Sequence, residues 1–151
     1  MHRTGPNGFN VPYGNYSNPT IYDSEHLEEI SKLIKDVEFS HGTFEDSIKN
    51  AKKGHYLYFD PVYFPVDTKS FVGYNSDGFG KEIHDKLFKI CQELKDKNID
   101  WMMSNSDVEY VKDFFKDIKK YTTNIIECRR AINAKKPGSK ANEVIITTYK
   151  V

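Results

Sequence analysis

Apolar residues recur along this chain in two patterns, at spacings of three and four residues or in short continuous runs. The first pattern predicts helices with one buried face, and the second predicts buried strands. Four helices are predicted, with expected starts at Ser24, Thr43, Ser76 or Asp77, and about Asp107. Their apolar faces are Leu27, Ile30 and Ile34; Phe44, Ile48 and Ala51; Phe79, Ile83, Leu87, Ile90 and Leu94; and Val111, Phe114 and Ile118.

Short apolar runs predict four strands, over residues 56–59, 99–103, about 122–128 and 143–149. The first three alternate with helices, and the last two flank a polar loop that contains Pro137-Gly138. Strands that alternate with helices indicate an α/β fold. We therefore expect a mostly parallel sheet that closes on a C-terminal antiparallel hairpin.

The first twenty residues differ from the rest because proline and glycine are frequent there, as in Gly5-Pro6-Asn7-Gly8 and Asn18-Pro19. This density predicts a shaped loop region rather than a helix or strand. The 151 residues are enough for one buried core, and no composition shift argues for a second.

Charge and composition exclude several classes of protein. The 22 basic and 22 acidic residues give a net charge of zero, so any contact with nucleic acid must come from a local basic patch. Neither the apolar core of a signal peptide nor a membrane-length apolar run is present. From this absence no contact with a membrane is expected. Cys91 and Cys128 fall in a predicted helix and a predicted strand, which indicates a reduced, intracellular protein. The five histidines show no metal-ligand spacing, so no metal site is predicted.

The segment Asp60-Pro61-Val62-Tyr63 directly follows the first predicted strand. Open α/β sheets bind their ligands at the carboxyl ends of the strands. There the Asp60 carboxylate and the Pro61 carbonyl could accept the two hydrogens of a nucleobase amine, and Tyr63 could stack on the base. The alternative is an ordinary turn in which Asp60 bonds nearby amides and Tyr63 belongs to the core.

Further segments, in the same order, resemble the Dam-type (D12 class) adenine-specific N6 DNA methyltransferases over nearly the whole chain. Arg3 and the segment 8–16 are similar to that family's target-recognition loop, and residues 54–65 are similar to its catalytic strand and turn. Phe71, Tyr74 and Phe79 follow at the spacing of its aromatic loop. Residues 103–107 match its next strand end, and residues 129–133 and 142–149 match its closing hairpin.

This resemblance implies a partial Rossmann-like methyltransferase fold that uses S-adenosylmethionine to methylate a flipped adenine in DNA. It implies Asp60, Pro61 and Tyr63 as catalytic residues, with Asp60 also near the cofactor. The DNA-binding residues that it implies are Arg3, Phe9, Asn10, Pro12, Asn15, Arg129, Arg130, Lys135 and Lys136. For the last four, with Lys140, a solvated hairpin loop is an equally good interpretation. The expected location is the cytoplasm of a bacterial, phage or viral system.

The chain also departs from the family pattern. Val62 stands where the family has a second proline, which would restrict the preceding residue, so we expect a looser turn that lowers rate more than binding. Asn15 stands where relatives that read GATC often carry arginine, so that specificity does not transfer. The segment Gly78-Phe79-Gly80 follows a loop, so it does not replace the family's Phe-x-Gly-x-Gly cofactor turn, which the sequence lacks.

We therefore expect residues 1–22 to be a remnant of the recognition region and residues 23–151 to be the carboxyl-terminal half of the catalytic domain. The strand before Asp60 would then have an unpaired edge. Two functions stay open: an adenine methyltransferase, or a split subunit or inactive remnant that binds DNA or a second chain without methylating alone.

Overall fold

The computed structural model describes residues 21–66, 79–129 and 139–150, together with Ser17 and the backbone of residues 4–5 and 8–9. Contacts divide the chain into two compact units, residues 1–43 and 44–151, and we treat each by itself.

The first unit contains a helix and a small two-stranded sheet. Helix α1 (Ser24–Leu33) begins after Asp23, whose carboxylate accepts a hydrogen bond from the His26 amide at 3.1 Å. The helix predicted from Ser24 is thus confirmed, with its cap one residue earlier. None of its side chains is buried. Strands β1 (Thr4–Gly5) and β2 (Gly8–Phe9) pair antiparallel within the predicted loop region.

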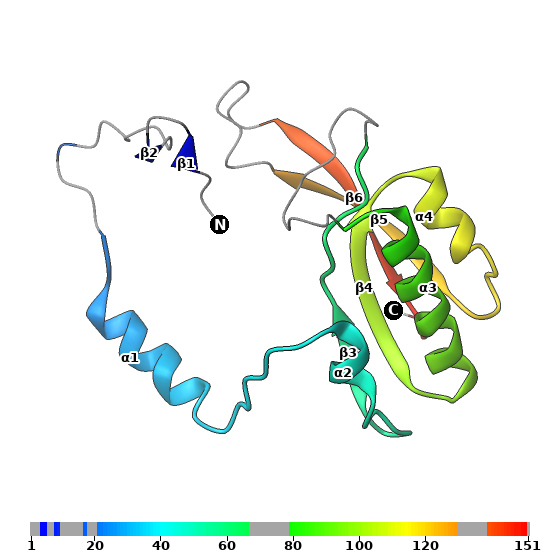
Figure 1. Ribbon diagram of the computed structural model, residues 1–151, viewed down its shortest axis with the longest axis horizontal. Coiled ribbons are helices and arrows are strands. Elements are labelled where there is room, and N and C mark those ends of the chain that lie inside the picture. Colours follow the sequence, from blue (N-terminus) through cyan, green and yellow to red (C-terminus); the bar gives the residue numbers. More distant parts are fainter. Residues whose placement is uncertain are drawn as a thin grey trace. The chain divides into compact units, whose positions relative to one another are not determined.

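The second unit is built on a four-stranded sheet with the order β3-β4-β6-β5 (Figure 1). Its strands are β3 (Tyr56–Phe59), β4 (Asp100–Ser106), β5 (Thr122–Arg129) and β6 (Lys140–Thr147). All four predicted strands are confirmed. Within the described residues β3 lies at the edge of the sheet and pairs with β4 alone.

The expectation of a mostly parallel sheet is wrong, because the sheet is mixed. Only β3 and β4 pair in parallel, whereas β6 runs antiparallel to both of its neighbours, β4 and β5. The chain reverses after β5 and inserts its last strand between β4 and β5. Val144, Ile146 and Thr147 are fully buried, which suits a strand that is paired along both edges.

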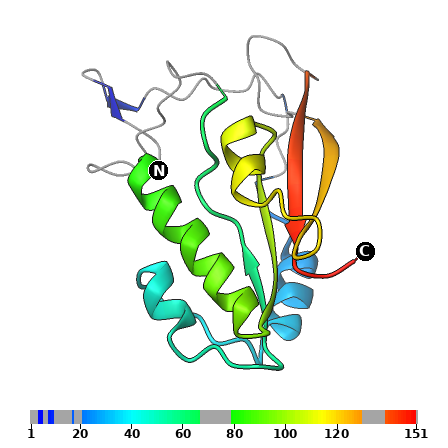
Figure 2. The ribbon, with the colours of Figure 1, turned by 90° about the vertical axis from the view of Figure 1, so that its right-hand side faces the viewer.

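Helices α3 (Lys81–Asp96) and α4 (Glu109–Phe114) pack on one face of this sheet, the face seen in Figure 2. The short helix α2 (Phe44–Ile48) precedes β3, and Gly54, with φ of +93°, turns the chain into that strand. Helix α3 begins at Lys81 after the N-cap Gly80, later than the expected start at Ser76 or Asp77. Those two residues lie outside the described part of the chain.

The inward face predicted for the last helix is partly wrong. Val111 is buried, but α4 ends at Phe114, and Ile118 lies beyond it with 89% of its surface exposed. Phe115 is buried in its place. Because the helical repeat stops after six residues, the spacing that pointed Ile118 inward no longer applies.

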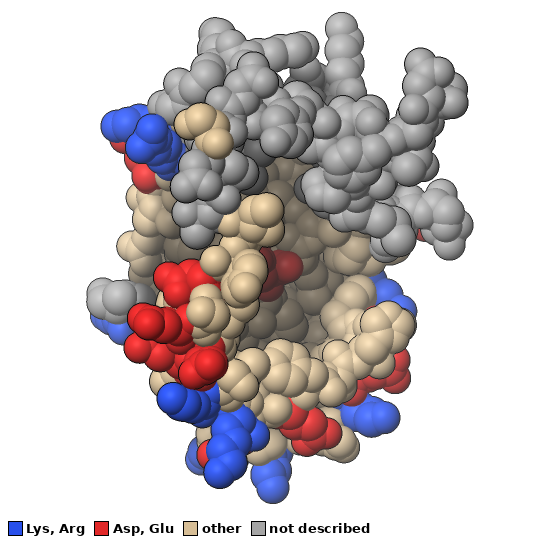
Figure 3. All heavy atoms as spheres, turned by 90° about the vertical axis from the view of Figure 1, so that its left-hand side faces the viewer, with Lys and Arg blue, Asp and Glu red and all other residues tan. Residues whose placement is uncertain are grey.

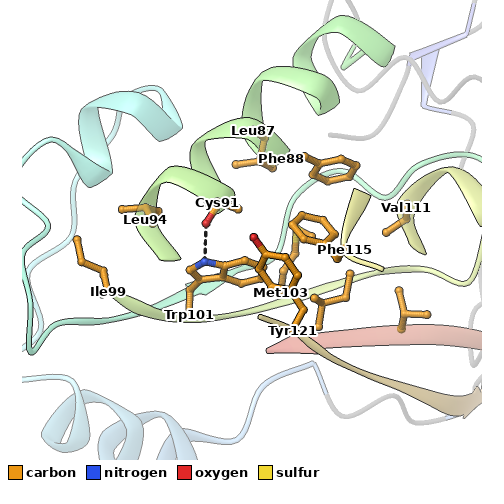
Figure 4. Packing of buried hydrophobic residues seen from close by; sticks show 12 residues of the cluster. Leu87, Phe88, Cys91, Leu94, Ile99, Trp101, Met103, Val111, Phe115 and Tyr121 are labelled. Atoms are coloured by element: carbon orange, nitrogen blue, oxygen red, sulfur yellow. Dashed lines mark hydrogen bonds between the residues drawn. The ribbon is translucent and has the colours of Figure 1, made fainter. Parts of the chain in front are cut away.

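The core lies between the sheet and α3 (Figure 4). Trp101 at its centre donates a hydrogen bond from its indole nitrogen to the Cys91 carbonyl at 2.8 Å. The rings of Phe115 and Tyr121 pack on Trp101 at centroid distances of 5.4 and 5.8 Å. The buried side chains of α3 are His84, Leu87, Phe88, Cys91 and Leu94. Leu87 and Leu94 of the predicted stripe are therefore buried, whereas Phe79, Ile83 and Ile90 are only partly buried, so the buried face is shifted from the predicted one.

Candidate functional site

Asp60 directly follows β3, at the free edge of the sheet. The parallel pairing of Phe59 with Met103 places Asp60 beside Ser104, the next residue of β4. The buried Ser104 hydroxyl donates a hydrogen bond to Asp60 Oδ1 at 2.9 Å. Among the described residues Ser104 is the only hydrogen-bond partner of this exposed carboxylate, so Oδ2 stays available to a ligand.

Tyr63 approaches the same point from the turn that follows. Its hydroxyl donates to Glu143 Oε2 at 3.2 Å, so β6 also contributes to the site. Burial raises the pKa of Tyr63 to about 12, and the negative charges of Glu143 and Asp60 add to the shift, while a hydrogen bond with Ser104 opposes it. The phenol therefore stays protonated at neutral pH. The Asp60 carboxylate is close enough for its charge to act on the Tyr63 phenol.

The side chains of β3 alternate between two environments. Leu57 and Phe59 pack on the core, whereas Tyr56 and Tyr58 are about half exposed on the other face. The Tyr58 hydroxyl donates to Ser104 at 3.2 Å, which adds a second polar contact to the residue that holds Asp60. A pocket of about 270 Å³ opens beside the turn, lined by Phe44, Ile48, Phe59, Asp60, Pro61 and Phe79 among others.

Two buried polar side chains contact the backbone around Tyr63. The Phe64 amide donates to Asn105 Oδ1 at 2.9 Å, and His84 Nε2 lies 2.9 Å from the Val62 carbonyl oxygen. The sequence alone predicts no role for His84, Ser104, Asn105 or Glu143. Ser104 and Asn105 could have been found, because they end a buried strand, and His84 interrupts the apolar face of α3. No local signal distinguishes Glu143.

The predicted DNA-binding residues are only partly described. Arg129 is exposed at the end of β5, and Phe9 belongs to β2, of which only the backbone is described. Lys140, which the sequence analysis grouped with the basic loop, forms an ion pair with Glu127 and is partly neutralised. The other predicted residues lie outside the described part of the chain: Arg3, Asn10, Pro12, Asn15, Arg130, Lys135 and Lys136.

Among the described side chains drawn in Figure 3, acidic and basic residues form small separate groups, and Lys and Arg form no broad patch. Within the described ranges no cluster of His, Cys, Asp or Glu side chains is arranged to hold a metal ion. In the same ranges, every helix is too short or too polar to span a membrane.

Comparison with known proteins gives the family. Residues 1–132 match the model of the D12 class N6 adenine-specific DNA methyltransferases. The chain is 36% identical to the type II methyltransferase M1.LlaDCHI of Lactococcus lactis subsp. cremoris, in an alignment that covers 95% of this chain and 51% of that protein. It is 34% identical to the type II methyltransferase M.MjaIII of Methanocaldococcus jannaschii, over 99% of this chain and 52% of the relative.

The DNA adenine methylase of Escherichia coli K12 is 26% identical over 99% of this chain and 56% of its own length. The chain thus spans about half the length of the curated relatives that it matches. Since the family model covers 132 of the 151 residues, the chain belongs to the D12 class of N6 adenine-specific DNA methyltransferases.

Proposed function

We propose that this chain forms the adenine-binding part of a site-specific DNA methyltransferase, which transfers a methyl group from S-adenosylmethionine to N6 of a flipped adenine. The observation that carries the proposal is the carboxylate of Asp60 at the free edge of the sheet, held through one oxygen by Ser104, with Tyr63 beside it. Such an enzyme would work in the cytoplasm, where the DNA lies.

The proposed mechanism uses the acceptors of the 60–63 turn. Adenine N6 is a poor nucleophile, because its lone pair is delocalised into the ring. Asp60 Oδ2 and the Pro61 carbonyl would accept its two hydrogens, which favours a tetrahedral nitrogen and frees the lone pair for attack. Tyr63 would stack on the extruded base, whose exit from the duplex is needed for access. Asp60 and Tyr63 would thus hold the base in a reactive geometry.

The residues present fit the reacting end of S-adenosylmethionine. When bound, this cofactor supplies an electrophilic methyl group on a positively charged sulfur. The exposed Asp60 carboxylate beside the pocket of about 270 Å³ suits its methionyl ammonium group. The sequence has no Phe-x-Gly-x-Gly turn to hold the remainder, so Asp60 is the contact that we assign to this chain.

A methyl-incorporation assay on duplex DNA tests the proposal, with Asp60→Asn as the test variant. The amide keeps the shape of the carboxylate but loses its charge and one acceptor oxygen, so we expect incorporation to fall by about a hundredfold or more. Asp113→Asn, an exposed aspartate of α4, is the matched control. Equal incorporation by Asp60→Asn and the wild type would refute the role of Asp60.

A second candidate function is that of a split subunit or inactive remnant that needs another chain to methylate. It is favoured by β3, which lies at the edge of the sheet and pairs on one side only within the described residues. Isothermal titration with S-adenosylmethionine separates the two. Tight stoichiometric binding by this chain alone would refute the second candidate. Methylation that appears only after a polypeptide with the glycine turn is added would support it.

A further inference from the structure

His84 is a fully buried polar residue in the apolar face of α3. Its Nδ1 lies 3.0 Å from the Gly80 carbonyl oxygen, and its Nε2 lies 2.9 Å from that of Val62. The Gly80 oxygen also accepts the His84 amide, at 3.2 Å. The Val62 oxygen has no other partner among the described residues. Both oxygens only accept, and a neutral imidazole carries a single ring proton. We assign that proton to Nε2, because the Gly80 oxygen already accepts the His84 amide, whereas no other described group donates to the Val62 oxygen.

Asn105 makes the corresponding contact on the other side of Tyr63. It is fully buried at the end of β4, and its Oδ1 accepts the amides of Phe64 and Ser106, each at 2.9 Å. The two peptide groups that flank Tyr63 are therefore held by two different elements, α3 and β4. Both side chains are buried, so the loss of either one would leave its backbone partner, the Val62 carbonyl or the Phe64 amide, without this hydrogen bond.

Aromatic packing supports the same segment. The Phe64 ring lies 4.2 Å from the ring of Tyr110 and 5.2 Å from that of His84, between centroids. The Phe79 ring also packs on His84, with 4.7 Å between the ring centroids. The imidazole therefore has little freedom to rotate away from Val62.

We propose that His84 and Asn105 are positioning residues, which clamp the backbone on both sides of Tyr63 and so set where its ring and hydroxyl lie relative to Asp60. We call this pair the His84–Asn105 clamp. It would restrain a turn in which Val62 takes the place of the family's second proline. The inference rests on the proposed function, because the clamp matters for catalysis only if Tyr63 contacts the flipped base.

Two substitutions of His84 separate its hydrogen bonds. The amide nitrogen of glutamine can reach the position of Nε2, so His84→Gln keeps the donor to Val62. The amide nitrogen of asparagine reaches only the position of Nδ1, so His84→Asn loses that donor. If His84→Asn does not fold, His84→Phe takes its place, since it keeps the ring but has no donor. Asn105→Ala removes the other half of the clamp.

The first readout requires no catalysis. Tyrosine ring ¹³Cζ NMR, assigned with Tyr63→Phe, follows the titration of Tyr63, whose pKa is raised to about 12. We expect this pKa to move toward 10 in His84→Asn and Asn105→Ala and to stay in place in His84→Gln. Hydrogen exchange at the Phe64 amide should quicken about tenfold in Asn105→Ala, the equivalent of a lost hydrogen bond.

The second readout is methyl transfer by the full chain, with a complementing polypeptide if the chain needs one. We expect His84→Asn to lower kcat by about tenfold to a hundredfold with little change in KM for DNA, and His84→Gln to restore most of the rate. The clamp is refuted if His84→Asn leaves the Tyr63 titration unchanged, or if His84→Gln behaves like His84→Asn. If the wild type does not methylate DNA, either alone or with a complementing polypeptide, the proposed function is refuted instead. The NMR result would still decide whether the clamp exists.

Discussion

The two oxygens of Asp60 lie in different surroundings, and this difference matters for the proposed chemistry. Oδ1 accepts from the buried Ser104, which itself accepts from Tyr58 at 3.2 Å. The bond to Oδ1 restricts rotation of the carboxylate, so Oδ2 points in a defined direction. A charge-assisted hydrogen bond of this kind favours one rotamer of an exposed carboxylate, although water can replace it as a partner.

We predict that Ser104→Ala lowers the rate of methyl transfer by about tenfold to a hundredfold, because the Asp60 carboxylate becomes free to rotate. Stability should change little, since water can replace the serine at this exposed oxygen. Tyr58→Phe is the matched comparison, because it removes the hydroxyl behind Ser104 without touching Asp60, and its effect should be smaller. Single-turnover methylation measures both variants. A rate for Ser104→Ala equal to that of the wild type would contradict the prediction.

At the scale of elements, the short helix α4 decides how the end of the core is filled. Phe115 directly follows this helix and packs on Phe88, Trp101 and Tyr121 at centroid distances of 5.2–5.4 Å. Ile118 occupies the position that continued helical spacing would turn inward, yet it is exposed. Because α4 ends at Phe114, Phe115 rather than Ile118 fills this part of the core.

The contrast between the buried Phe115 and the exposed Ile118 gives a paired prediction for stability. Phe115→Ala removes a buried ring from an aromatic cluster and should lower the free energy of unfolding by about 3–5 kcal/mol. Ile118→Ala should change it by no more than about 0.5 kcal/mol, because the side chain is exposed. Urea denaturation followed by the fluorescence of Trp101 measures both, since this indole contacts the Phe115 ring. Similar losses for the two variants would mean that α4 continues beyond Phe114.

At the scale of the whole molecule, the net charge of zero limits how the protein could attract DNA, its proposed substrate. Without a long-range field, phosphate contacts must come from a local group of cations. The sequence suggests the stretch from Arg129 to Lys136, in which Arg129, Arg130, Lys135 and Lys136 carry no acidic residue between them. Contacts of this kind add affinity without reading bases.

The salt dependence of DNA binding tests this assignment. We predict that the double variant Lys135→Ala/Lys136→Ala weakens binding and reduces the slope of log K against log salt by roughly two, at about 0.9 per phosphate contact. The double variant Lys52→Ala/Lys53→Ala removes the same charge at exposed positions before β3 and should leave the slope unchanged. Fluorescence anisotropy with a labelled duplex gives both slopes. Equal slopes for the two double variants would mean that Lys135 and Lys136 do not contact DNA phosphates.

The sequence by itself determined the structural elements that depend on residues close together along the chain. The strand before Asp60, the turn with Pro61 and Tyr63, the four predicted helices and the closing hairpin all follow from local spacing and turn residues, and the structure contains them. The resemblance to the family rested on the same short motifs, and the family comparison confirms it.

Tertiary structure alone decided which distant residues meet. The insertion of β6 between β4 and β5 made the sheet mixed and brought Glu143 to Tyr63, 80 residues away along the chain. The sequence marks His84 and Asn105 as polar residues in buried elements, but their contacts with the turn are long-range and do not follow from spacing. The physical reason is that spacing shows which face of an element is apolar, whereas the order of strands depends on how those faces are buried together.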